Sequence, residues 1–109
     1  MCQLRFSEVS TRRQAFIRRC QRMGYGKIRD LAVRDGDPVF GAHTAVLVDV
    51  KLDATEIRRP EQDLTDFELR AEVVRLFHNF DLIGSGAVEH VEVRGGLPVR
   101  MLIKDPEQL

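Results

Sequence analysis

Hydrophobic positions recur at helical spacing in two stretches of the chain, and the first lies near the N-terminus. Its apolar residues follow the i, i+1, i+4, i+7 spacing of one buried helix face. They are Phe16, Ile17, Cys20 and Met23. This stripe predicts a helix over residues 11–23. Thr11 and Gln14 fit a capping box at its start, and Gly24 and Gly26 fit its end.

A second helix is predicted over residues 66–81. Thr65 and Glu68 have the spacing of another capping box. The apolar stripe of this helix consists of Val73, Leu76, Phe77 and Phe80.

Two similar hairpin sequences follow the two helices. They read "VRDGDPVF" over residues 33–40 and "VRGGLPVR" over residues 93–100. A three-residue loop keeps the apolar residues on one face, with Val91 opposite Val99 and Val93 opposite Leu97. A two-residue turn is the alternative, and it places Val33 opposite Pro38.

The prolines and the spacing of apolar residues predict irregularities in these strands. Proline donates no ladder hydrogen bond, so Pro38 and Pro98 are each expected to mark an edge or a break in the sheet. Apolar residues fall at positions 28, 31 and 33, and again at 88, 91 and 93. The same failure of strict alternation predicts a bulge near Asp30 and His90.

One predicted strand has no counterpart in the repeat. Residues 44–52, "TAVLVDVKL", alternate between apolar and polar positions. Their apolar face consists of Val46, Val48, Val50 and Leu52. Residues 53–63 are then expected to be a polar linker, since Pro60 argues against a helix.

The two helix–hairpin units are displaced by sixty residues, and such a repeat changes the expected fold. The element order is α-β-β-β-α-β-β. Short turns between consecutive strands predict an α+β fold, with an antiparallel sheet and both helices on one face. We expect a single domain over residues 1–109. Its parts are a loose segment 1–10, a first unit 11–43, an inserted strand and linker 44–63, a second unit 64–104 and a tail 105–109.

Each unit resembles the YezD-like family of very small bacterial proteins, which combine a short helix, a "YG" or "FG" break and a "V-x-D-G-x-x-V" hairpin. The matching residues of the first unit are Tyr25, Gly26, Ile28, Val33, Asp35, Gly36 and Val39. Those of the second unit are Gly86, Val88, Val93, Gly96 and Val99. This chain departs from the family in having two units, an inserted strand and a proline after each turn. The resemblance implies a bacterial protein and a local fold, and it implies no activity.

Composition places the chain among ordinary soluble domains. Of its 109 residues, 43% are hydrophobic and 31% are charged, which is typical of one globular domain. No apolar run is long enough to span a membrane, and the N-terminus lacks the apolar centre of a secretion signal. Cys2 and Cys20 form neither a disulfide framework nor a zinc motif. We therefore expect a reduced, cytoplasmic protein with no cofactor or metal and no membrane partner.

Charge is distributed unevenly, although the net charge is zero. Residues 1–34 contain nine basic and two acidic residues, whereas residues 35–109 contain eight and fifteen. The first helix has basic residues at Arg12, Arg13, Arg18, Arg19 and Arg22. Like charges at i, i+4 cost about 0.2–0.5 kcal/mol, so an anion is expected to compensate Arg18 and Arg22. That anion is either nucleic-acid phosphate or the acidic second half of this chain or of a second copy.

A nuclease site is the most specific enzymatic alternative. The element order resembles the core of the restriction-endonuclease-like nucleases, in which acids hold Mg²⁺ and a lysine steadies the attacking water. Asp37, Asp49 and Lys51 are the candidate residues, with Glu8 as a loosely placed third ligand. The chain reads Asp37-Pro38 where that family has Pro-Asp. The alternative is that Asp49 and Lys51 form the solvated face of a strand.

No other catalytic pattern is present in the sequence. His43, His78 and His90 do not pair at metal-ligand spacing, and no phosphate-binding loop occurs. A sheet covered on one face recruits a second copy in many proteins. The sequence therefore predicts a non-enzymatic binding or assembly module that forms a homodimer. The alternatives are nucleic-acid binding through the arginine-rich helix and metal-dependent nuclease activity.

Overall fold

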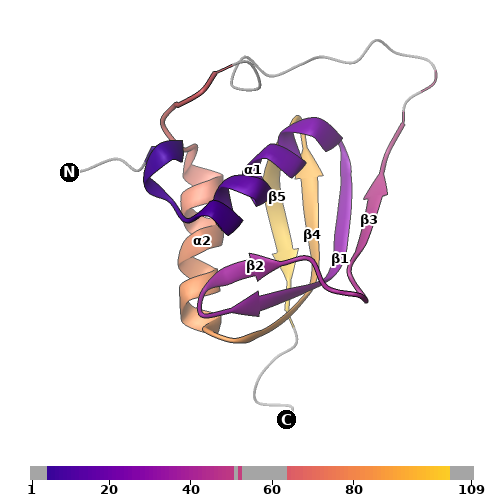
Figure 1. The fold of residues 1–109 in the computed structure, drawn as a ribbon. Helices are drawn as coiled ribbons and strands as arrows, with labels where there is room; N and C mark the ends of the chain where they lie inside the picture. The colour runs from indigo at the N-terminus through magenta and orange to yellow at the C-terminus, as the bar shows by residue number, and fades with distance from the viewer. Residues whose placement is uncertain (1–4, 51, 53–63, 104–109) are drawn as a thin grey trace.

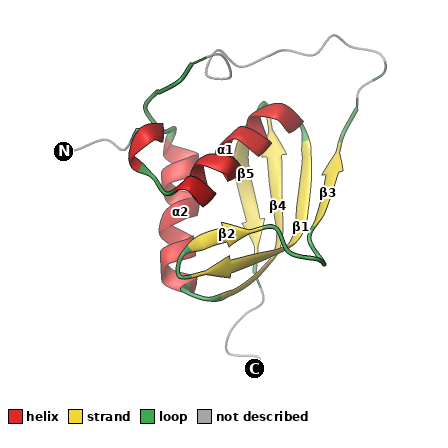
Figure 2. Cartoon of the chain, in the orientation of Figure 1, coloured by secondary structure: helices red, strands yellow, loops and turns green. Residues whose placement is uncertain are grey.

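Two helices pack on one face of a five-stranded antiparallel sheet, as expected for the α+β class (Figures 1 and 2). The computed structural model describes residues 5–50, 52 and 64–103. In chain order the elements are the 3₁₀ turn η1 (Phe6–Glu8), α1 (Thr11–Met23), β1 (Gly26–Arg34), β2 (Asp37–Val39), β3 (Ala45–Val48), α2 (Ala71–Ile83), β4 (Gly86–Arg94) and β5 (Leu97–Leu102). Neither α1 nor α2 is long and apolar enough to cross a membrane.

The sheet is built around β1 and β4, and the strands follow the order β2-β1-β4-β5. The other side of β1 is shared by two short strands. β2 pairs with its end at residues 32–34, and β3 pairs with its beginning at residues 26–29 (Figure 1). The inserted strand was expected over residues 44–52, and the observed strand β3 is shorter, covering Ala45–Val48. Lys51, the linker 53–63 and the tail 105–109 lie outside the described residues.

The two units are related by an approximate two-fold axis between the central strands. The bounds of α2 and β4 equal those of α1 and β1 displaced by sixty residues. Ile28 lies opposite Val91, and Leu31 lies opposite Val88. Val88 is the sixty-residue equivalent of Ile28, and Val91 is that of Leu31. Exchanging the two units therefore turns the pair Ile28–Val91 into the pair Val88–Leu31, which is also observed.

The core lies between the helices and the inner face of the sheet. Both predicted helix stripes are buried, and they meet through their aromatic rings. Phe16 of α1 contacts Phe80 of α2 edge-on, with 5.9 Å between ring centroids. The buried residues of the central strands, spaced three and then two positions apart in each strand, complete this core; they are Ile28, Leu31, Val33, Val88, Val91 and Val93.

The first helix has the predicted bounds but a different cap. Ser10 is the N-cap, and its side chain accepts the backbone N–H of Arg13 at 3.2 Å. Thr11 is already helical, so the predicted Thr11–Gln14 capping box is wrong by one residue. The amide of Gln14 instead donates to the backbone oxygen of Val9 at 3.0 Å.

The second helix begins later than predicted because the preceding segment pairs with the N-terminal turn. The N–H of Phe6 donates to the backbone oxygen of Phe67 at 2.8 Å, and the two rings stack at 5.0 Å. The helix starts at Ala71, and its N-cap makes no side-chain hydrogen bond, so the capping box predicted upstream is absent. Within the expected loose segment, Phe6 is consequently buried and residues Phe6–Glu8 form the turn η1.

Both hairpins use two-residue turns, so the three-residue loop is wrong and the alternative is confirmed. Arg34 pairs with Asp37, and Arg94 pairs with Leu97. The two turn residues between each pair have positive φ, at 51° and 79° in the first hairpin and 57° and 80° in the second. Asp-Gly and Gly-Gly tolerate this left-handed conformation, which matches the twist of a hairpin.

The two prolines lie in edge strands, as predicted from their missing N–H. The predicted bulge is displaced. The pairing of β1 with β4 keeps one register past Asp30, which instead adopts a left-handed φ of 54°. A register shift does occur between β4 and β5, next to Glu92 and Val93.

Candidate interaction surfaces

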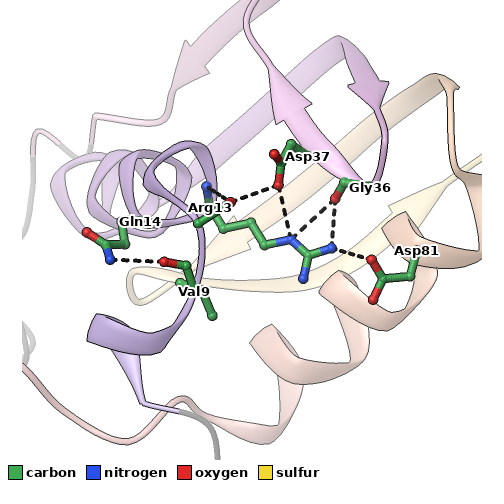
Figure 3. A network of polar contacts seen from close by, with 7 residues as sticks. Val9, Arg13, Gln14, Gly36, Asp37 and Asp81 are labelled. Atoms are coloured by element: carbon green, nitrogen blue, oxygen red, sulfur yellow. Dashed lines mark hydrogen bonds and ion pairs between the residues drawn. The ribbon is translucent and has the colours of Figure 1, made fainter.

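The arginines of α1 divide into two groups, and Arg13 belongs to the group with structural contacts. Its guanidinium approaches Asp81 of α2 at 2.5 Å and Asp37 of β2 at 3.6 Å (Figure 3). It also donates to the backbone oxygen of Gly36 at 2.8 Å, and it lies 4.8 Å from the ring centre of Phe77. Arg13 thus connects a helix of each unit to the first hairpin.

Arg18 has a second structural role, at the N-terminal turn. Its guanidinium carbon lies 4.3 Å from the ring centre of Phe6 and 5.3 Å from that of Phe67. The same group donates to the backbone oxygen of Leu64 at 2.5 Å and to Gln21 at 2.9 Å. Arg18, predicted as an anion-binding residue, is therefore engaged by this chain's own rings and oxygens.

Arg12, Arg19 and Arg22 form the second group, which we call the α1 arginine stripe. Their spacing places them along one side of the helix, and all three are exposed. None of them forms an ion pair with any residue in the described ranges. Over ten residues the stripe spans about 15 Å at ~1.5 Å per residue.

The nuclease candidates are not brought together. Asp37 pairs with Arg34 at one end of β1, whereas Asp49 follows Val48, which pairs with Gly26 at the other end. Those contacts are eight positions apart along β1, which corresponds to about 26 Å at ~3.3 Å per residue. Asp37 accepts hydrogen bonds from Ser10 at 2.7 Å and lies beside Arg13.

The remaining candidates do not assemble a metal site. Glu8 accepts the backbone N–H of Arg5 at 2.8 Å, so it caps the N-terminal turn. Within the described part of the chain, no group of three His, Cys, Asp or Glu side chains is placed to hold a metal ion. Lys51 lies outside the described residues. Cys20 is buried in the core, and burial raises the pKa of its thiol to about 12.

The edge strand β3 consists of apolar residues over its whole length. Val46 faces Ile28 and packs partly against the core. Leu47 and Val48 are 47% and 50% exposed, and Val50 beyond the strand is 65% exposed. Of the apolar face predicted for this strand, Val46 therefore packs against the core, whereas Val48 and Val50 extend beyond it and are exposed. An open pocket of about 470 Å³ lies beside this strand, between the beginning of β1 and the end of β4.

The other edge strands carry features that disfavour pairing. β2 contains Pro38, and β5 contains Pro98, a register shift and Arg100. Proline, bulges and charged residues all block the addition of another strand. The four residues of β3 include no proline, no bulge and no charged residue. The sequence alone could not identify β3 as an edge strand, because its position depends on the order of strands in the sheet.

Comparison with known proteins gives no relative from which a role could be transferred: no protein-family model, curated protein or solved structure matches this chain.

Proposed function

We propose that the protein is a non-enzymatic assembly module that forms a homodimer by pairing β3 with β3 of a second copy. The observation that carries the proposal is the contrast among the three edge strands. β2 and β5 are protected, whereas β3 pairs with β1 alone among the described strands and carries exposed apolar side chains. Antiparallel pairing of one strand with its own copy is self-complementary, as a two-fold dimer requires.

The apolar side chains and backbone groups of this edge favour a dimer whose stability depends little on salt concentration. Leu47 and Val48 would be shielded from water by the second copy, and backbone hydrogen bonds would extend the sheet. Attraction between the basic and acidic halves would instead be screened at high ionic strength. A dimer that persists in raised salt therefore supports pairing through β3.

Sedimentation velocity over a dilution series tests the proposal. We expect the wild-type chain to dimerise and the Leu47→Lys chain to remain monomeric, because an edge lysine disfavours strand pairing. Val99→Lys is the matched control, since Val99 is also an apolar residue of an edge strand and is 43% exposed. A wild-type chain that stays monomeric at every concentration, or a Leu47→Lys chain that dimerises normally, would contradict the proposal.

Nucleic-acid binding is a second candidate, and the α1 arginine stripe favours it. Three exposed guanidinium groups without ion pairs among the described residues could contact about three phosphates. Fluorescence anisotropy with labelled duplex DNA and single-stranded RNA at low salt measures such binding. We expect Arg19→Glu with Arg22→Glu to abolish binding and Arg34→Glu with Arg100→Glu to retain it. If both variants lost the same amount of binding, the binding would depend on net charge alone, and the α1 arginine stripe would not be a nucleic-acid site.

The location that we propose is the cytoplasm. Cys20 is a thiol without a disulfide partner among the described residues, as a reducing compartment favours.

A further inference from the structure

The face of the sheet that points away from α1 and α2 carries a distinct set of side chains. Both helices pack on the opposite face, where the core lies (Figure 1). Four strands lie side by side in the order β3-β1-β4-β5. Inward residues of these strands, such as Ile28 and Val91, are buried in the core. Their neighbours along each strand point outward, because side chains of a strand alternate between the two faces of a sheet.

The outward side chains of these four strands form two rows, which together we call the outer patch. The strand registers place Leu47, Lys27, Glu92 and Arg100 side by side in the first row. They place Ala45, Arg29, His90 and Leu102 side by side in the second row. All of these side chains are exposed or half-buried. With neighbouring strands ~4.8 Å apart, each row spans about 14 Å.

Positive charge on the outer patch exceeds negative charge. Lys27, Arg29 and Arg100 are exposed, and none of them forms an ion pair with a described residue. Glu92 is the acid of the patch, and its carboxylate already lies 3.3 Å from the guanidinium of Arg94, a further cation. An acidic occupant would therefore be attracted to this face, and a basic one repelled.

An exposed leucine lies at each end of a diagonal across the outer patch. Leu47 of β3 is 47% exposed, and Leu102 of β5 is 42% exposed. Three strand spacings and one step between rows separate them, which corresponds to about 16 Å. Three turns of an α-helix span the same length, at ~5.4 Å per turn. A helix with apolar residues at i and i+11 and carboxylates at i+4 and i+7 presents all four on one side.

We propose that the outer patch binds an acidic amphipathic helix of a partner protein. The carboxylates of this helix would face Lys27, Arg29 and Arg100, and its apolar residues would contact Leu47 and Leu102. The two leucines favour a protein segment over nucleic acid, because phosphate groups gain nothing from apolar contacts. The site lies on the face of the sheet away from the α1 arginine stripe. It does not depend on dimer formation, since pairing through β3 extends the edge of the sheet and leaves its face accessible.

Titration of the full-length chain, followed by NMR, tests the proposal. The probe is the acetylated, amidated peptide Ala-Gln-Leu-Ala-Gln-Ala-Glu-Ala-Gln-Glu-Ala-Ala-Gln-Leu-Ala-Gln, and the matched probe has lysine in place of both glutamates. We expect the glutamate peptide to shift the signals of Lys27, Arg29, Arg100 and Leu102. It should bind about tenfold more tightly than the lysine peptide.

A charge reversal within the patch provides the decisive comparison. Arg29→Glu should weaken the glutamate peptide by about tenfold and strengthen the lysine peptide. Arg19→Glu is the control, because it changes the net charge equally at an exposed residue of α1, outside the patch. Equal weakening in both variants would assign the binding to net charge and overturn the proposal. Equal binding of the two peptides to the wild-type chain would do the same, as would the absence of shifts at the patch.

Two further outcomes would identify a different occupant. Displacement of the glutamate peptide by a single-stranded RNA, with shifts at the same residues, would assign the outer patch to nucleic acid. Shifts of Arg100 and Leu102 that grow with protein concentration in the absence of peptide would assign it to a second copy, because β5 lies across the sheet from the β3 edge. Either result would overturn the proposal without affecting the test of pairing through β3.

Discussion

Gly36 donates its backbone N–H to the carbonyl oxygen of Gly84 at 2.8 Å, and Gly96 donates to Gly24 at the same distance. Gly24 and Gly84 are the C-caps of α1 and α2. Each hairpin turn is therefore tied to the end of the helix in the other unit. The two units therefore interlock through equivalent hydrogen bonds.

Replacement of Gly36 by alanine should weaken this connection. Gly36 has a φ of 79°, and an added Cβ would lie 2.7 Å from the carboxylate of Asp81. We expect Gly36→Ala to lower the free energy of unfolding by about 2 kcal/mol, measured by urea denaturation. Gly41→Ala is the control and should be nearly neutral, because nothing lies closer than 4.0 Å to its Cβ position. Equal stability of the two variants would contradict this account.

Arg13 and its neighbour Arg12 should differ sharply in their contribution to stability. The Arg13 side chain is 15% exposed and contacts Asp37, Asp81 and Gly36, whereas Arg12 is exposed. We expect Arg13→Ala to cost about 2–3 kcal/mol, because Asp81 and the carbonyl of Gly36 lose their donor and Asp37 loses a neighbouring cation. Arg12→Ala should change stability by less than about 0.5 kcal/mol.

A lysine variant tests the shape of the Arg13 contact. Arg13→Lys retains the charge but cannot reproduce the planar fork that reaches several oxygens at once. We expect urea denaturation to show only partial recovery relative to Arg13→Ala. Full recovery would mean that charge alone accounts for the contribution of Arg13.

Local patterns predicted the two helix stripes, the element order and the edge prolines, because periodicity and proline chemistry act within a few residues. The start of α2 depended on a distant partner. Thr65 and Glu68 have capping-box spacing, but the intervening segment pairs with Phe6, about sixty positions away. No local signal reports such a competing contact.

The division among the arginines was only partly visible in the sequence. Arg13 precedes Phe16, Ile17 and Cys20 at helical spacings of three, four and seven, so its position on the core side could have been recognised. Arg18 gave no such signal, because its rings come from η1 and from the segment before α2. Asp37 and Asp49 looked like one site because their separation along β1 depends on where β2 and β3 pair.

Acid should release the N-terminal turn. The side chain of Arg5 and the backbone N–H of Ser7 donate to Asp66, and together they lower the pKa of this carboxyl from 3.8 to about 2. A carboxyl with a lowered pKa stabilises the fold above its ordinary pKa, and this contribution is lost as pH falls toward the lowered value.

NMR of the Ser7 amide checks this expectation. Its signal should move with a midpoint near pH 2, the lowered pKa of Asp66 in the folded chain. Asp66→Asn removes the ionisable group and should eliminate this transition. A transition that survives in Asp66→Asn would assign the change to another carboxyl.

Cys20 should report opening of the core. Its side chain is 1% exposed, and burial raises the pKa of the thiol to about 12, so almost no thiolate exists at neutral pH. Because the thiolate is the reactive form, labelling with a thiol reagent requires exposure of the core. In a Cys2→Ser background we expect slow labelling in buffer and acceleration by urea in parallel with the loss of helical circular dichroism. Rapid labelling in buffer would show that the α1 face of the core opens without global unfolding.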